Sequence, residues 1–184
     1  MNKMRLVILG ATGSIGTQAL DVVRMHPDKL EVVALAAGRR VDEMVRYAQE
    51  FGCRHLAFGD EAVRDAPALA QLDDGVFVDF GAPAVAALTQ LDDVDIVLNA
   101  LSGEAGMRAS YDTLKAGRTL ALANKESLVV GGDLIMPLAT HETLLPVDSE
   151  HSAIYQCYLG EFPHDARKIW LTCSGGPFRG MTRD

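Results

Sequence analysis

The chain has 184 residues, an apolar share of 48% and a formal net charge of −8 at pH 7. This length can hold one sizeable core, or one domain and part of a second, and the acidic balance argues against general nucleic-acid binding, which needs a basic surface. No apolar run approaches the ~20 residues that span a bilayer, and the N-terminal residues have no signal-peptide pattern. We therefore expect a cytoplasmic protein without a nucleic-acid or membrane partner. The three cysteines lack a CxxC spacing and are expected to be reduced, buried thiols.

Apolar runs rich in Val, Ile and Leu alternate along the chain with helical patterns. Strands are expected at residues 6–9, 32–36, 55–57, 75–79, 95–99 and 119–123. Helices are expected at residues 16–25, 41–50, 61–72, 83–91, 105–116 and 132–140. Repeated strand–helix–strand units imply right-handed crossovers and a parallel sheet, and strands without clean two-residue alternation are typical of a sheet covered on both faces. The sequence therefore predicts an α/β fold with a Rossmann-like, doubly wound parallel sheet.

The character of the chain changes near Leu144. Residues 144–160, LLPVDSEHSAIYQCYLG, predict a strand that ends in polar residues and leads into a helix. Residues 168–180, KIWLTCSGGPFRG, predict a further strand that runs into a glycine turn. We expect one domain over residues 1–146 and the start of an α+β domain over residues 147–184. No later element closes this second unit, so we expect the chain to be a fragment.

The first expected strand runs into a glycine-rich loop, GATGSIG, at residues 10–16. In the G-x-G-x-x-G pattern the first glycine makes the turn, the second lets the backbone approach a pyrophosphate, and the third allows close helix–strand packing. This chain has Ala11, Gly13 and Gly16 in that frame, with Gly10 in addition. A helix is expected to follow, and its N-terminus can bind phosphate through free N–H groups. The context favours dinucleotide binding over a purely structural turn.

The residues after the second expected strand indicate which dinucleotide binds. NAD sites usually carry an acidic residue there, which holds the ribose 2′-hydroxyl. This chain instead has Gly38, Arg39 and Arg40. Guanidinium groups pair bidentately with phosphate, so the sequence favours the 2′-phosphate of NADP(H). The alternative is that both arginines are solvated loop charges.

A polar triplet, Asn124-Lys125-Glu126, directly follows the sixth expected strand. Ligands bind beyond the carboxyl ends of parallel strands, so the triplet should face the same crevice as the glycine loop. Lys125 could stabilise a developing oxyanion or hold a phosphate or hydroxyl group. An equally good alternative makes Asn124 a helix cap, followed by a solvated ion pair.

Two further motifs lie in the last third of the chain. Asp148 and Glu150 flank Ser149, and their carboxylates could reach one hard divalent cation such as Mg²⁺ or Mn²⁺. The alternative is strong, because Asp148 could simply cap a helix with Glu150 in its first turn. Ser174, followed by two glycines, could form an anion-binding nest or an ordinary turn.

Four blocks, GATGSIG, ANKESLV, LLPVDSEH and LTCSGGPF, are together far more specific than any one of them. Their order and spacing closely resemble those of the 1-deoxy-D-xylulose-5-phosphate reductoisomerase family, over essentially the whole chain. The resemblance implies a homodimeric, NADPH-dependent oxidoreductase of the non-mevalonate isoprenoid route, with Mg²⁺ or Mn²⁺. Its substrate would be the sugar phosphate 1-deoxy-D-xylulose 5-phosphate and its product 2-C-methyl-D-erythritol 4-phosphate.

The resemblance also implies a role for each motif residue. The NADPH-binding residues would be Thr12, Gly13, Ser14, Ile15, Gly38, Arg39, Arg40, Asn124 and Glu126. The catalytic and substrate-binding residues would be Lys125, Ser149 and Glu150, with Ser174 on the substrate phosphate. The metal ligands would be Asp148 and Glu150.

Members of this family are considerably longer, and a third metal-binding carboxylate, a lid loop and a helical domain follow the region matched here. Two carboxylates should hold a divalent ion poorly, so we expect this chain to bind NADP(H) but to turn over slowly or not at all. Cys173 stands where a small residue such as glycine is expected. A nucleotide-binding module without catalysis remains an alternative, and so does a dehydrogenase acting on an amino-acid-derived aldehyde.

Overall fold

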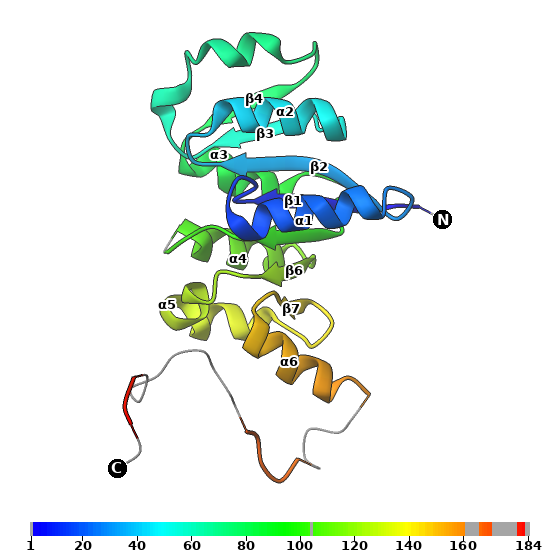
Figure 1. Ribbon diagram of the computed structural model, residues 1–184, viewed down its shortest axis with the longest axis vertical. Coiled ribbons are helices and arrows are strands. Elements are labelled where there is room, and N and C mark those ends of the chain that lie inside the picture. The colour runs from blue at the N-terminus through cyan, green and yellow to red at the C-terminus, as the bar shows by residue number, and fades with distance from the viewer. Residues whose placement is uncertain (1, 104, 161–165, 171–179, 183–184) are drawn as a thin grey trace. The chain divides into compact units, whose positions relative to one another are not determined.

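The computed structural model describes residues 2–103, 105–160, 166–170 and 180–182 (Figure 1). The chain separates into two compact units, Met1–Leu145 and Pro146–Asp184, which are considered one at a time. Among the helices in the described part of the chain, none is long and apolar enough to cross a membrane.

The first unit is built on a sheet in the order β4-β3-β2-β1-β5-β6-β7. Its strands are β1 (Met4–Leu9), β2 (Leu30–Ala37), β3 (His55–Phe58), β4 (Phe77–Phe80), β5 (Ile96–Asn99), β6 (Thr119–Leu122) and β7 (Leu144–Pro146), whose last residue opens the second unit. The strands from β1 to β6 pair in parallel. The chain moves outward from β1 to β4 and then returns to the other side of β1 with β5, so the order reverses between β1 and β5.

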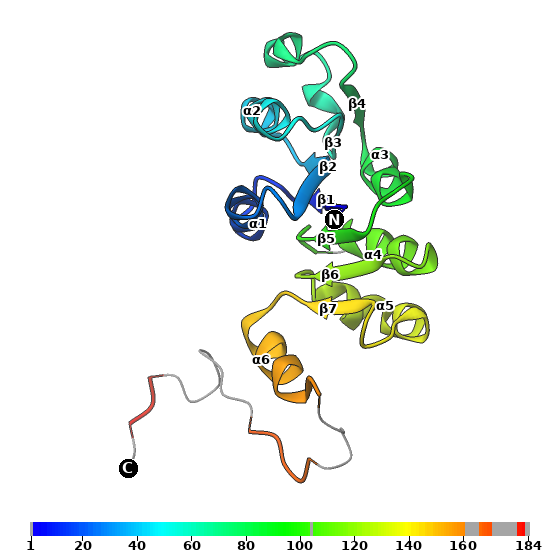
Figure 2. The same cartoon turned by 90° about the vertical axis from the view of Figure 1, so that its right-hand side faces the viewer.

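Helices cover both faces of the sheet, with α1 and α2 on one face and α3, α4 and α5 on the other (Figure 2). The helices are α1 (Ser14–Met25), α2 (Val41–Phe51), α3 (Ala82–Ala87), α4 (Ala105–Lys115), α5 (Glu126–Ile135) and, in the second unit, α6 (Ser149–Tyr158). The described residues also form four short 3₁₀ segments, η1 (Glu61–Val63), η2 (Pro67–Gln71), η3 (Leu88–Gln90) and η4 (Met136–Leu138). The predicted doubly wound α/β fold is confirmed.

Two predicted helices were placed wrongly. The helix expected at residues 61–72 is instead η1 and η2, because Pro67 has no N–H to donate and holds Ala66 in an extended conformation (ψ 127°). The helix expected at residues 132–140 is α5, which begins six residues earlier, at Glu126. Gly131 is a non-helical position inside this helix (φ −124°, ψ 20°).

One core cluster of the first unit lies where β1 and β5 meet the helices α3 and α4. Val7, Leu9 and Val97 are completely buried there, and Val85 and Ala109 pack in the same cluster. Burying one such valine or leucine side chain contributes about 1.5–3 kcal/mol. The register places Leu9 opposite Ala36 of β2 and Asn99 of β5, so the loops that follow these three strands start at one level.

The second unit begins at Pro146 and contains α6. The strand predicted from Lys168 is absent over residues 166–170, which have no regular secondary structure; the rest of that motif lies outside the described residues. Cys53 is buried, as expected, but Cys157 on α6 is exposed, so the expectation of a buried thiol was wrong there. Cys173 lies outside the described residues.

Candidate functional site

The loop between β1 and α1 uses its three glycines differently. Gly10 has a φ of +86°, and a Cβ there would lie 2.5 Å from the carbonyl oxygen of Ala100. A Cβ at Gly16 would lie 2.2 Å from the carbonyl oxygen of Gly10. A Cβ at Gly13 would meet only that same oxygen, at 3.3 Å. The chain's own packing therefore requires Gly10 and Gly16, whereas Gly13 leaves an open face that a ligand could approach.

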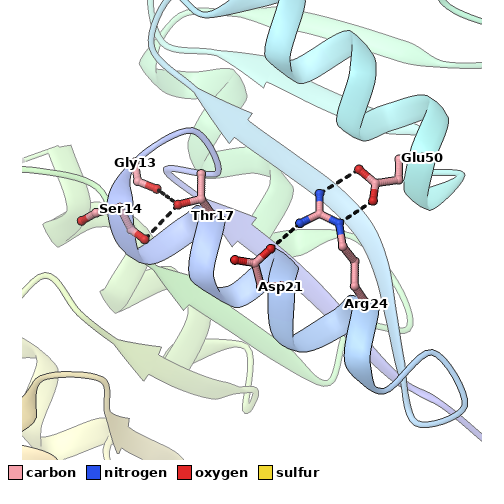
Figure 3. A network of polar contacts seen from close by, with 6 residues as sticks. All are labelled: Gly13, Ser14, Thr17, Asp21, Arg24 and Glu50. Atoms are coloured by element: carbon pink, nitrogen blue, oxygen red, sulfur yellow. Dashed lines mark hydrogen bonds and ion pairs between the residues drawn. The ribbon is translucent and has the colours of Figure 1, made fainter.

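The N-terminus of α1 carries no side-chain cap on its N–H groups. Within the described residues, the first amide of this helix with a backbone acceptor is that of Thr17, which donates to the carbonyl of Gly13 at 2.9 Å. The Thr17 hydroxyl donates to the carbonyls of Gly13 and Ser14, both at 3.0 Å (Figure 3). These bonds hold the first turn while the amides of Ser14, Ile15 and Gly16 and the positive end of the helix dipole stay available to an anion. Sequence reasoning missed Thr17, although its place one turn after the loop was a usable signal.

The helices α1 and α2 are joined at their far ends by Arg24. Its guanidinium donates to Glu50 at 2.5 and 2.8 Å and to Asp21 at 2.5 Å (Figure 3). The Arg24 guanidinium, chiefly by hydrogen bonding, lowers the pKa of Glu50, and Glu50 in turn raises the pKa of Arg24. This bridge links α1 to α2 at the end of each helix that lies away from the glycine loop.

The arginine pair lies at the end of β2, as the sequence indicated. Arg40 reaches back to the glycine loop, where its Nη1 donates to the carbonyl of Thr12 at 2.9 Å. Arg39 donates through Nε to Asp60 Oδ2. Asp60 also accepts from the amide of Ala62 at 2.9 Å, and this bond, followed by that from Arg39, lowers the Asp60 pKa. Sequence reasoning missed Asp60, because its proximity to Arg39 depends on how β3 pairs with β2.

A cleft of about 890 Å³ opens beside this loop. It lies beyond the carboxyl ends of β1, β2, β3 and β5, where the strand order reverses, which is the usual ligand position in open parallel sheets. Its lining from these loops comprises Gly10, Gly13, Ala37, Gly38, Gly59, Ala100, Leu101 and Ser102, and α3 and α4 complete it. The structure thus gathers the glycine loop and Gly38 around one cavity.

Two buried asparagines, Asn99 and Asn124, bond to the loop that follows β5. Asn99 donates to the carbonyl of Gly106 at 2.7 Å and to the Ser110 hydroxyl at 2.8 Å, and it accepts from the amide of Leu101 at 3.2 Å. Asn124, 2% exposed, donates to the carbonyls of Leu101 and Gly103 at 2.5 and 2.9 Å. The pair therefore ties the cleft-lining loop after β5 to the start of α5. Sequence reasoning missed Asn99, which ends a predicted strand and was interpreted only as part of it.

The Asn124 side chain also accepts from the amide of Ser127 at 2.9 Å and from the Ser127 hydroxyl. The capping alternative therefore describes this side chain, whose polar atoms all bond within the chain. Lys125 and Glu126 are exposed at the start of α5. The expected roles of all three toward ligands stay predictions.

The acidic motif of the second unit forms the start of α6. Asp148 is its N-cap and accepts from the amide of His151 at 3.3 Å, while the Ser149 hydroxyl donates to Glu150 at 2.7 Å. The capping geometry is thus present. Carboxylate oxygens suit Mg²⁺ or Mn²⁺, so Asp148 and Glu150 fit as part of a ligand set. Over the described ranges, no group of three His, Cys, Asp or Glu residues could hold a metal. Ser174 lies outside the described residues.

Comparison with known proteins gives the family. A family model described as 1-deoxy-D-xylulose 5-phosphate reductoisomerase matches residues 6–132, and that of the C-terminal domain of the same family matches residues 144–184. The reductoisomerase of Desulfitobacterium hafniense is 48% identical over 98% of this chain and 48% of its own length. That of Mycobacterium tuberculosis is 46% identical over 98% of this chain and 42% of its own. The chain thus spans about half the length of these curated relatives.

Solved structures agree with the sequence comparison. The enzyme from Zymomonas mobilis in complex with NADPH has a TM-score of 0.86 and 37% identity, over 98% of this chain and 48% of that one. A reductoisomerase in complex with NADPH, fosmidomycin and magnesium has a TM-score of 0.75 and 36% identity, over 84% of this chain and 38% of that one. The chain belongs to the 1-deoxy-D-xylulose 5-phosphate reductoisomerase family.

Proposed function

We propose that this chain is the N-terminal part of an NADPH-dependent enzyme that converts 1-deoxy-D-xylulose 5-phosphate into 2-C-methyl-D-erythritol 4-phosphate. Residues 1–146 would form the NADPH-binding domain and residues 147–184 the start of the catalytic domain. One observation carries the proposal: the N-terminus of α1 has no side-chain cap, and it follows Gly13, which lines the cleft and has space for a ligand beside its backbone. This cleft lies where the strand order reverses. Family membership supplies the substrate.

The cofactor would lie along the cleft with its pyrophosphate at the start of α1. The amides of Ser14 and Ile15 and the open face of Gly13 suit a pyrophosphate, because they offer donors without a blocking side chain. The 2′-phosphate would lie beyond Gly38, where the guanidinium groups of Arg39 and Arg40 provide positive charge. Thr12 would be held in place by its bond from Arg40.

Family membership suggests a role in substrate binding for four residues of this chain. Lys125 would place an ammonium group beside the reacting carbonyl, with Asn124 and Glu126 at the nicotinamide end of the cofactor. Asp148 and Glu150 would ligate the divalent cation, while the hydroxyls of Ser149 and Ser174 would bind a substrate hydroxyl and the phosphate. When bound, NADPH supplies the hydride and the cation polarises the substrate oxygens.

This chain by itself would bind NADPH and turn over slowly or not at all. Mg²⁺ needs near-octahedral oxygen ligation, and two carboxylates leave most of that shell to water. A homodimer, Mn²⁺ as an alternative cation and a cytoplasmic location belong to the same proposal, and the homodimer rests on the resemblance alone.

The test uses a polypeptide of the relatives' length that begins with this chain. We expect it to oxidise NADPH only when 1-deoxy-D-xylulose 5-phosphate and Mg²⁺ are both present. Lys125→Ala should lower kcat by about 100-fold or more, as removal of a charge-stabilising donor does. Lys29→Ala, which removes an exposed lysine between α1 and β2, is the matched control and should leave kcat unchanged. NADPH binding without any substrate-dependent oxidation would instead favour the non-catalytic module.

A further inference from the structure

Asp60 is a rigidly held carboxylate at the edge of the nucleotide cleft. It follows Gly59, which lines the cleft, and its amide donates to the carbonyl of Gly38 at 3.3 Å. Its Oδ1 accepts from the amide of Ala62 at 2.9 Å, so the side chain caps η1. The side chain is 23% exposed. Two backbone contacts therefore fix where this carboxylate lies, independently of any partner side chain.

The Arg39 side chain, by contrast, is long and flexible, and 81% of its surface is exposed. Its one hydrogen bond within the described part of the chain is from Nε to Asp60 Oδ2. A guanidinium offers two edges to oxyanions, one formed by Nε and one Nη and the other by both Nη atoms. Because Asp60 engages Nε, the edge with both Nη atoms stays available for a forked contact with a phosphate.

We propose that Asp60 is a positioning residue that holds Arg39 for the 2′-phosphate of NADPH, and thereby contributes to the preference for NADPH over NADH. The inference rests on the proposed function. The carboxylate orders a long side chain before the nucleotide arrives, so less side-chain freedom is lost on binding. Preorganisation of this kind acts only on the nucleotide that carries the 2′-phosphate.

Direct repulsion is the opposing effect, because a carboxylate close to a phosphate dianion weakens its binding. Here the charge of Asp60 is compensated by Arg39 in direct contact, and its second oxygen is turned toward the Ala62 amide. The positioning effect therefore outweighs repulsion, and removal of the carboxylate should weaken NADPH binding and not tighten it.

The decisive variant is Asp60→Ser, because serine retains an oxygen that can cap η1 but is too short to reach Arg39. Kd values for NADPH and NADH would be measured by isothermal titration for the unaltered 184-residue chain, Asp60→Ser, Arg39→Ala and the double variant. Asp42→Ser removes the same charge from the first turn of α2 and serves as the matched control. Thermal unfolding of each variant reports whether it is folded.

We expect Asp60→Ser to raise the Kd for NADPH about threefold, the effect of one exposed charge pair, and to leave the Kd for NADH unchanged. The control variant Asp42→Ser should bind both nucleotides with the Kd values of the unaltered chain. In the Arg39→Ala background Asp60→Ser should have no further effect. If Asp60→Ser bound NADPH as tightly as the unaltered chain or more tightly, or if its affinity for NADPH and NADH fell equally, this inference would be overturned and the proposed function would stand. If the unaltered chain bound neither nucleotide, the proposed function would fail and this inference with it.

Discussion

Two substitutions that each add one methyl group to the glycine loop test different properties. Gly16→Ala tests the packing of the loop, and Gly13→Ala tests ligand binding. The Cβ that Gly16→Ala introduces would lie 2.2 Å from the Gly10 carbonyl oxygen, whereas ordinary contact begins at 3.4 Å, so the backbone must give by 1.2 Å. The Cβ that Gly13→Ala introduces would lie 3.3 Å from the same oxygen and needs a shift of only 0.1 Å. Gly13 also has φ −82° and ψ 173°, which alanine adopts readily.

These distances set the size of each effect. Overpacking costs about 1–3 kcal/mol, and the upper end applies at Gly16 because the atoms it meets are backbone. The higher helix propensity of alanine offsets up to about 1 kcal/mol. Gly16→Ala should therefore destabilise the chain by about 2 kcal/mol and lower Tm by about 4–8 °C. Gly13→Ala should change stability by less than about 0.5 kcal/mol.

The assay pairs thermal unfolding, followed by circular dichroism, with titration of NADPH. We expect Gly13→Ala to melt like the unaltered chain but to bind NADPH at least about tenfold more weakly, which is about 1.4 kcal/mol. A Gly16→Ala variant as stable as the unaltered chain would refute the packing argument. A stable Gly13→Ala variant with full NADPH affinity would refute the placement of the pyrophosphate.

Three further outcomes follow from the structure. Glu50→Gln should cost at most about 1 kcal/mol, because the pair with Arg24 is exposed to solvent. The pKa of the Glu50 carboxyl is lower in the folded chain than its ordinary value of 4.5. The ion pair therefore stabilises the fold fully above pH 4.5, and this stabilisation is lost as the pH falls through the lowered pKa. Urea unfolding at several pH values measures this loss. Asn99→Ala should cost about 1–3 kcal/mol for each buried backbone group left without its partner, measured by urea unfolding against an exposed Asn2→Ala control. Burial raises the pKa of the Cys53 thiol to about 12, so iodoacetamide should label Cys157 but not Cys53 until the chain unfolds, as mass spectrometry would detect; early labelling of Cys53 would contradict its burial.

The sequence was sufficient to predict those elements that depend on a local pattern of residues. The alternation of apolar runs with helical patterns predicted the parallel sheet, and the glycine loop predicted the start of α1 to within two residues, because both signals depend on neighbouring residues. Pro67 was a readable helix breaker that the pattern of residues 61–72 outweighed. A Cβ at Gly131, the non-helical position inside α5, would lie 2.6 Å from the terminal methyl group of Met107 in α4, a contact between elements that a local pattern does not show.

Of the missed residues, Thr17 acts locally on the first turn of α1, whereas Asp60 and Asn99 act between different elements. Asp60 meets Arg39 only because β3 pairs with β2, and Asn99 meets Gly106 only because α4 packs over the end of β5. For Asn124 the sequence left ligand binding and helix capping evenly matched. Internal hydrogen bonds show that its buried side chain caps the first turn of α5 and bonds to the loop after β5, while its expected role toward the cofactor stays a prediction.

The central claim is that the cleft binds a 2′-phosphorylated dinucleotide. Isothermal titration of the 184-residue chain with NADPH and with NADH tests it most directly, beside the double variant Arg39→Ala/Arg40→Ala and the exposed-arginine control Arg54→Ala. We predict at least about tenfold tighter binding of NADPH, a preference that the double variant loses and the control retains. Equal affinity for both nucleotides, or a preference that survives loss of both arginines, would contradict it.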